Sequence, residues 1–149
     1  MKRESEVIVV YWDTSAVLSS LFTDDHSPQA QYWANREGFH FLSTLTYAET
    51  CAVIARMRRE RRVAEIVAEA AMEAFHEGPW RRVDAQPAWN HIEALSRKWA
   101  LRGADLWHLA VAKGLRDQTP ELILLTFDER LHVSARGEGL VEIKGVSRT

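Results

Sequence analysis

The sequence has little that would mark a secreted or membrane-bound protein. Its 149 residues include one cysteine, Cys51, so an internal disulfide is excluded. The apolar stretch at residues 7–12 is much shorter than a signal peptide requires, and no run reaches the roughly 20 apolar residues of a membrane-spanning helix. We therefore expect a cytoplasmic protein that does not associate with a membrane.

A strong net charge is also missing. Nineteen Lys and Arg stand against 21 Asp and Glu, and this balance neither indicates nor excludes a nucleic-acid partner. The basic residues do gather in one dense run: Arg56, Arg58, Arg59, Arg61 and Arg62. On charge alone, this run is typical of a solvated junction between two helices. The alternative is a surface that contacts the phosphates of a nucleic-acid backbone.

Hydrophobic patterning predicts strands that alternate with helices. Expected strands cover residues 7–11, 39–42, 80–83, 122–126 and 140–143. Expected helices cover residues 16–22, 27–35, 46–60, 63–76, 88–101 and 104–115, with a short one opening at residue 128. The length fits one domain over residues 1–149. The prediction is an α/β fold, a three-layer sandwich with a mostly parallel central sheet flanked by helices.

Four acidic residues stand where such a sheet would collect them. Asp13 and Asp128 follow the first and fourth predicted strands, and Asp105 and Glu49 lie in the first turns of predicted helices. Ligands of open parallel sheets bind outside the carboxyl ends of the strands, where loops and helix N-termini converge. The four carboxylates are therefore candidates for one shared site.

Each acid also has an ordinary structural explanation. Aspartate is a favoured helix N-cap, and residues 46–49 and 126–129 both match a capping box, so Glu49 and Asp128 taken singly are better explained by helix capping. Taken together, the four acids would repel one another. The repulsion between two carboxylates 4 Å apart is about 1 kcal/mol in water and about 4 kcal/mol at an effective dielectric of 20. A divalent cation would relieve this repulsion. Oxygen-only ligands suit Mg²⁺ or Mn²⁺.

The segments around these acids resemble the four acidic motifs of PIN-domain nucleases. They read VVYWDTSA at residues 9–16, LTYAE at 45–49, LRGADLWHLA at 101–110 and LTFDERL at 125–131. They occur in the family's order and span nearly the whole chain. The compact length is similar to that of stand-alone VapC-type toxins. The resemblance implies a PIN-like fold, endoribonuclease activity, a divalent metal, a homodimer and a cognate antitoxin.

The resemblance also implies roles for individual residues. The catalytic carboxylates would be Asp13, Glu49, Asp105 and Asp128. Asp13 and Asp105 would hold the principal Mg²⁺ (or Mn²⁺), Asp128 would complete that site or help a second one, and Glu49 would act directly or through water. The ion would activate water for attack on RNA, with no nucleophilic side chain.

Polar neighbours of the acids are candidates for a supporting role. The hydroxyls of Thr14, Ser15 and Thr126 can orient a carboxylate or a bound water, although ordinary capping explains them at least as well. His108 lies one helical turn after Asp105 and is expected to be a core or supporting residue. In the nuclease interpretation, the run of five arginines between residues 56 and 62 would position RNA phosphates.

Two other functions stay open. A non-catalytic PIN-like module could use the same acidic cleft to bind a basic protein segment. A phosphatase or phosphotransfer enzyme of haloacid-dehalogenase type also keeps an aspartate after its first strand. That class resembles the pattern Asp-x-Asp, whereas the residue two positions after Asp13 is Ser15. Within the nuclease interpretation, the choice between RNA and DNA stays open as well.

Overall fold

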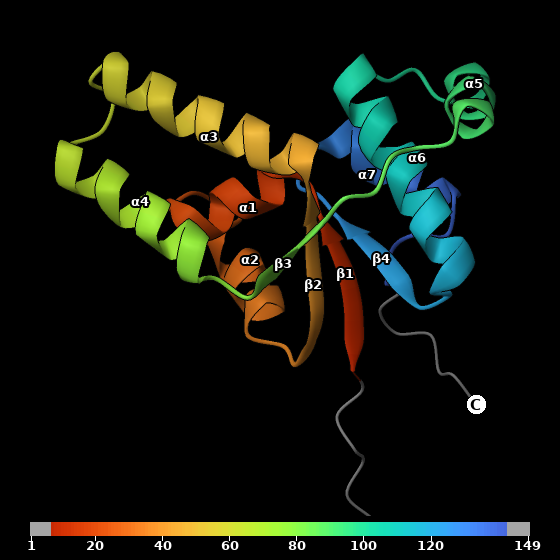
Figure 1. Cartoon of the computed structure of the whole chain (residues 1–149), viewed down its shortest axis with the longest axis horizontal. Helices are drawn as coiled ribbons and strands as arrows, with labels where there is room; N and C mark the ends of the chain where they lie inside the picture. The colour runs from red at the N-terminus through yellow and green to blue at the C-terminus, as the bar shows by residue number, and fades with distance from the viewer. Residues whose placement is uncertain (1–6, 143–149) are drawn as a thin grey trace, which may run out of the picture.

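A computed structural model describes residues 7–142 and contains a four-stranded sheet (Figure 1). The strands are β1 (Ile8–Trp12), β2 (Gly38–Ser43), β3 (Trp80–Val83) and β4 (Leu122–Leu125). They lie in the order β3-β2-β1-β4, and all three pairings are parallel. The helices are α1 (Thr14–Leu21), α2 (Ser27–Ala34), α3 (Thr44–Arg59), α4 (Glu65–Glu77), α5 (Trp89–Lys98), α6 (Gly103–Gln118) and α7 (Glu129–Gly137).

Strand β1 is buried on both faces, which explains its almost wholly apolar sequence. Side chains alternate along a strand, so Val9 and Tyr11 point to one face, and Ile8, Val10 and Trp12 point to the other. Each face meets its own hydrophobic core. The central strand therefore separates two layers of helices.

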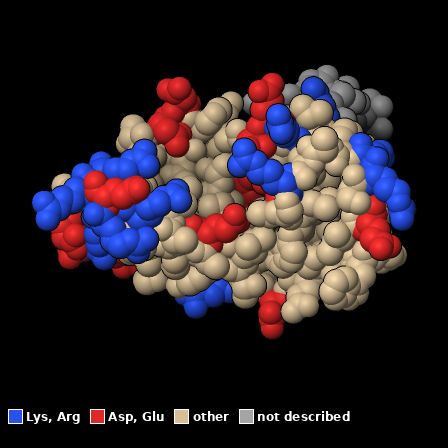
Figure 2. Space-filling model, turned by 90° about the horizontal axis from the view of Figure 1, so that it is seen from above, with Lys and Arg blue, Asp and Glu red and all other residues tan. Residues whose placement is uncertain are grey.

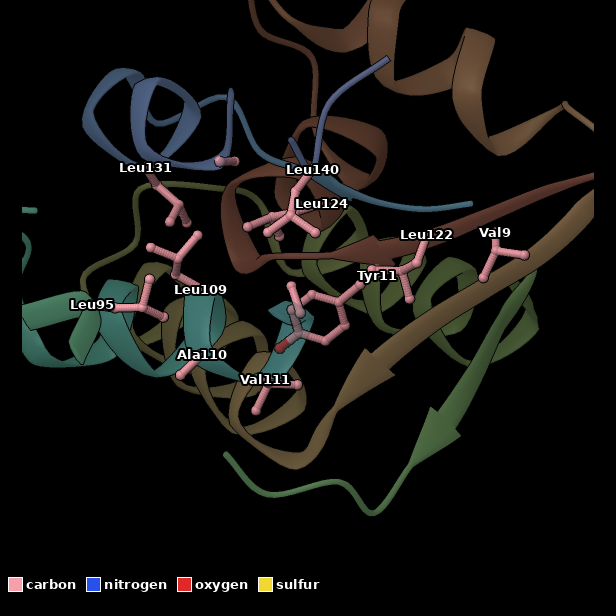
Figure 3. Close-up of a cluster of buried hydrophobic side chains, with 12 residues drawn as sticks. Val9, Tyr11, Leu95, Leu109, Ala110, Val111, Leu122, Leu124, Leu131 and Leu140 are labelled. Carbon is pink, nitrogen blue, oxygen red and sulfur yellow. The ribbon is translucent and has the colours of Figure 1, made fainter. Parts of the chain in front are cut away.

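The first core lies between the sheet and helices α5, α6 and α7 (Figure 3). Tyr11 and Leu124 of the sheet join Leu95 of α5, Leu109 of α6 and Leu131 of α7 in one buried cluster. The middle of α6, from residue 108 to residue 112, is buried in this core, while the two ends of the helix reach the surface.

The second core covers the opposite face, under helices α1 to α4. Trp12 of β1 packs in one cluster with Val17 of α1, Trp33 of α2 and Phe75 of α4. Helices thus cover both faces of a parallel sheet, with α1 to α4 on one side and α5 to α7 on the other (Figure 1). The predicted three-layer α/β fold is confirmed.

Several local predictions were wrong: one predicted strand is absent within residues 7–142, and helices α1, α3, α4, α5 and α6 differ from their predicted bounds by two or three residues at one end. Residues 140–142 do not form a strand, although the Leu140 carbonyl accepts a hydrogen bond of 2.7 Å from the N–H of Leu124 in β4; residue 143 lies outside the described residues. Helix α3 begins two residues earlier than predicted because Ser43 caps it, accepting from the N–H of Thr46 at 3.2 Å. The capping box over residues 46–49 is therefore absent. None of the helices within residues 7–142 combines the length and apolar character of a membrane span.

Candidate active site

The helix N-termini gather at one edge of the sheet. Helices α1, α3 and α7 start within four residues of the ends of β1, β2 and β4, and α6 begins on the same side (Figure 1). Figure 2 looks down on this edge and shows acidic groups near the middle of the face. The fold therefore brings the starts of four helices, and the acids on them, to one region.

Asp13 is the most fully engaged of the four acids. It is buried at 3% exposure and caps α1: its Oδ1 accepts from the Ala16 N–H at 2.9 Å and from the Ser15 hydroxyl at 2.7 Å. Its Oδ2 accepts from the Thr126 hydroxyl at 2.5 Å. Burial raises the pKa of Asp13, against the effect of these hydrogen bonds. A carboxylate oxygen has about two lone-pair sites, so Oδ2 retains one for a further ligand.

Glu49 is held from two sides in the first half of α3. Its Oε1 accepts from the Thr14 hydroxyl at 2.8 Å and from Nε2 of His108 at 2.8 Å. The hydrogen bond from His108 lowers the pKa of Glu49, although partial burial opposes this effect. Glu49, which the sequence taken singly explains better as a helix-capping residue, therefore has a fixed orientation and a stabilised charge.

His108 connects Glu49 to the core. It is 2% exposed, and its Nδ1 lies 2.7 Å from the hydroxyl of Tyr11, which in turn lies 2.8 Å from the hydroxyl of Ser43. If Nε2 of a neutral imidazole donates to Glu49, then Nδ1 accepts from Tyr11. Burial raises the pKa of Tyr11, so its hydroxyl keeps the proton that it donates.

This chain of donors includes two residues that the sequence analysis missed, Tyr11 and Ser43. Both lie in buried strand positions, and nothing in the local pattern separates them from ordinary core residues. The hydroxyls that were predicted to support the acids, those of Thr14, Ser15 and Thr126, all donate to Asp13 or Glu49. His108 is both a core residue and a donor to a candidate carboxylate.

Asp105 and Asp128 complete the acidic region. Asp105 is half-buried in the first turn of α6; burial raises its pKa, and the negative charges of Asp128 and Glu49 raise it further. Asp128 is exposed and caps α7, with Oδ1 accepting from the Leu131 N–H at 3.0 Å. Asp105 therefore lies close enough to Asp128 and Glu49 for their charges to act on it. The capping box predicted at residues 126–129 is replaced by this simpler cap.

The donor set can be tested against a divalent cation. In the part of the chain that the structure describes, no group of three or more His, Cys, Asp or Glu side chains is positioned to surround an ion. However, Mg²⁺ usually keeps several waters and takes only one or two protein carboxylates. Asp13 offers a free lone pair, and Asp13 and Asp105 both have raised pKa values that a neighbouring cation would lower. The chemistry of these residues fits a hard, oxygen-liganded ion.

The basic run lies apart from the acids, at the tip where α3 meets α4 (Figure 2). Arg58 is nine residues beyond Glu49 on the same helix, which corresponds to about 14 Å along its axis. Arg58 also pairs with Glu65 at 2.9 Å, and both side chains are largely exposed. The arginines therefore do not contribute to the acidic site itself.

Comparison with known proteins identifies the family. A family model described as "PIN domain" matches residues 10–136, most of the chain. The chain belongs to the PIN-domain family. Two curated relatives from Mycobacterium tuberculosis strains, Ribonuclease VapC45 and Ribonuclease VapC49, are each 32% identical to it over 134 residues, which cover 88% of this chain and 92% of theirs.

Solved structures agree with this PIN-domain fold. The M. tuberculosis protein VapC20, described as a sarcin-ricin loop cleaving toxin, has a TM-score of 0.57 at 16% identity, covering 90% of this chain and 98% of that one. PAE2754 from Pyrobaculum aerophilum also has a TM-score of 0.57, at 13% identity, covering 90% of each chain. Membership of the PIN-domain family gives no support to the haloacid-dehalogenase alternative, and the position where that class has its second aspartate is Ser15, a donor to Asp13.

Proposed function

We propose that this PIN-domain protein is a divalent-metal-dependent endoribonuclease and the toxin of a toxin-antitoxin pair. The observation that carries the proposal is the convergence of acidic side chains at one edge of the sheet, where burial raises the pKa of Asp105 and the charges of Asp128 and Glu49 raise it further, against the opposing effect of His108 and Arg102. Like charges gathered in this way are unfavourable, and a bound divalent cation would relieve their repulsion. The names of the two curated relatives, both ribonucleases, support RNA over DNA as the substrate.

Each acidic residue would have its own role in the reaction. Asp13, Asp105 and Asp128 would hold Mg²⁺ or Mn²⁺, and Glu49 would orient the attacking water. When bound, the cation supplies activation of that water and stabilisation of the extra negative charge on the phosphate. Thr126 and Ser15 fix the carboxylate of Asp13.

Glu49 would be held in position by Thr14 and His108, each of which donates to its Oε1 at 2.8 Å. Preorganised groups of this kind reduce the reorganisation needed at the moment of reaction. The arginines between residues 56 and 62 would hold RNA backbone some distance from the cleaved bond, because they lie at the far end of α3.

The remaining predictions belong to the same proposal. We propose one domain over residues 1–149, a homodimer, a cognate antitoxin protein and a cytoplasmic location. The relatives named VapC and the description of VapC20 as a toxin support the antitoxin partner. Sedimentation velocity of the purified protein would test the dimer: a single species with the mass of one chain would contradict it.

Cleavage of single-stranded RNA tests the activity. Purified protein should cleave with Mg²⁺ or Mn²⁺ and stop when a chelator is added. Asp13→Asn and Asp105→Asn should each lose at least about 100-fold in rate, since a charge needed at the reacting centre is gone. Asp117→Asn is the matched control, because Asp117 is exposed near the opposite end of α6 from Asp105. Cleavage that survives the chelator, or full activity in both site variants, would contradict the mechanism.

The non-catalytic alternative is separated by a second measurement. A PIN-like interaction module would bind a basic protein segment tightly without binding Mg²⁺ or Mn²⁺. Isothermal titration of the purified protein with Mn²⁺ should therefore show binding that Asp105→Asn weakens and Asp117→Asn does not. Unchanged RNA together with no heat of Mn²⁺ binding would favour the interaction module.

A further inference from the structure

A cavity of about 800 Å³ adjoins the acidic site on the outer side of β4. It lies between α2 and α7, and β4 is the edge strand of the sheet over the described residues. Thr126 and Phe127 are in its wall. Thr126 donates to Asp13, and Phe127 directly precedes Asp128. The cavity therefore begins where the candidate active site ends.

The wall of this cavity is rich in aromatic rings. The ring of His26 stacks on that of Phe127, with centroids 4.7 Å apart and planes 2° from parallel. On the facing helix α2, Tyr32 is 55% exposed and meets Trp33 edge to face at 5.9 Å. Flat aromatic surfaces of this kind favour a planar ligand that can stack on them.

The charges of the cavity argue against a phosphate as the main ligand. Two carboxylates, Glu129 and Glu142, line it together with Arg136 of α7, and Arg36, which is outside the lining, pairs with Glu142 at 3.0 Å. Opposite charges are nearly balanced, so no excess positive charge is left for an anion. The side chain of Gln29 adds an amide with both donors and acceptors. A planar, uncharged group with hydrogen-bonding edges satisfies all of these features.

We propose that this cavity is a nucleobase subsite, which receives one base of a single-stranded RNA next to the cleaved phosphodiester. The inference rests on the proposed nuclease function and adds how the substrate is selected. Sequence-specific proteins bind unpaired bases by stacking and by hydrogen bonds to the base edges. A base held here fixes the register of the strand across the acids, so the cavity selects the nucleotide beside the cut.

Binding by a non-cleaving variant tests the subsite. In an Asp105→Asn background, the affinity for a single-stranded oligoribonucleotide is compared with that for copies carrying one abasic nucleotide at each position in turn. One position should show a loss of about 10-fold, the scale of a lost base stack. His26→Ala or Tyr32→Ala should weaken binding of the intact strand similarly and remove that abasic effect. Trp89→Ala is the control, because Trp89 is an aromatic side chain on α5, 88% exposed and outside the cavity.

The result that overturns the subsite is an abasic effect of the same size in both cavity variants, or no abasic effect at any position. Because His26 and Tyr32 are exposed, both variants should fold, which far-ultraviolet circular dichroism verifies. Equal weakening by Trp89→Ala would also count against the subsite, since it would show that any exposed aromatic contributes.

A second measurement separates this inference from the proposed function. Titration of the wild-type chain with the four nucleoside monophosphates should shift the amide resonances of Gln29 and Ile123, which line the cavity. Such shifts without any RNA cleavage would keep the subsite and contradict the nuclease. Cleavage without them would keep the nuclease and contradict the subsite. Nuclear Overhauser contacts between Tyr32 and residues 143–149 in the free protein would show that the chain itself fills the cavity, and would overturn the subsite.

Discussion

Removal of the His108 side chain should damage both stability and catalysis, in a way that its contacts predict. His108→Leu deletes two hydrogen bonds: the one at 2.7 Å to Tyr11 and the one at 2.8 Å to Glu49. The hydroxyl of Tyr11 is buried and would lose its acceptor, at a cost of about 1–3 kcal/mol, although Ser43 stays within reach. Glu49 is 34% exposed, so water can replace the lost donor at less than about 1 kcal/mol.

The two contributions sum to about 1–4 kcal/mol, to be measured by urea denaturation at neutral pH. For a protein of this size the melting temperature should fall by roughly 2–16 °C. Tyr11→Phe removes the same hydrogen bond from its other end. The double variant should therefore be less destabilised than the sum of the single variants, by about 1–2 kcal/mol. Strict additivity would refute the contact.

The catalytic effect of His108→Leu should appear in kcat. Substitution of a residue that orients a catalytic carboxylate typically lowers activity by about 10- to 100-fold. Because His108 is buried and does not face the solvent, KM for RNA should change by less than about 2-fold. His108→Gln, whose amide can still donate to Glu49, should recover part of kcat. A change confined to KM, or no recovery by glutamine, would contradict the positioning role.

Three further changes test other parts of the structure. Glu138→Gln removes two lysine ion pairs; against the effect of burial, hydrogen bonds from Lys98, Trp99 and Lys113 lower the pKa of Glu138 to about 2. The ionised form of Glu138 is favoured in the folded state, so the ion pairs stabilise the fold above pH 4.5, and this stabilisation is lost as the pH falls toward 2. Urea denaturation should therefore show that Glu138→Gln lowers the free energy of unfolding by about 1–2 kcal/mol at pH 7 and by almost nothing at pH 2. Gly38→Ala should destabilise by about 3 kcal/mol in the same assay, because φ is +153° and an added Cβ would meet the Ile8 carbonyl at 2.2 Å. Thr126→Val leaves Asp13 without a 2.5 Å donor and should cost about 2 kcal/mol and most activity, whereas Thr126→Ser should restore both in cleavage and melting assays.

The sheet could be predicted because its central strand is buried on both sides. Residues 7–11 were predicted as a strand and Ile8–Trp12 is observed, a difference of one residue at each end. Asp13 and Asp128 could be placed at the carboxyl edge for the same reason, since each follows a recognisable strand. Their capping of α1 and α7 was also foreseeable from residue type.

The contacts between distant segments could not be predicted in this way. Tyr11 and His108 are 97 residues apart, and their hydrogen bond exists only because α6 packs across β1. The start of α3 was misplaced because Ser43 and Thr46 compete for the cap, and residue type alone does not decide between two hydroxyls. The arginine run was interpreted on charge alone as a solvated helix junction, with a phosphate contact as the alternative, and only the length of α3 shows how far it lies from the acids.

The ordinary capping roles of the acids and their proposed catalytic roles do not exclude each other. Asp13 uses Oδ1 to cap α1 and Oδ2 to accept from Thr126, and Asp128 uses Oδ1 alone to cap α7. Each cap fixes one oxygen and thereby aims the other, with no additional residues needed to orient it. Helix N-termini also carry partial positive charge, which partly offsets the repulsion among the acids before any cation binds. The caps that make these acids look structural in the sequence are therefore what would hold a carboxylate in position for catalysis.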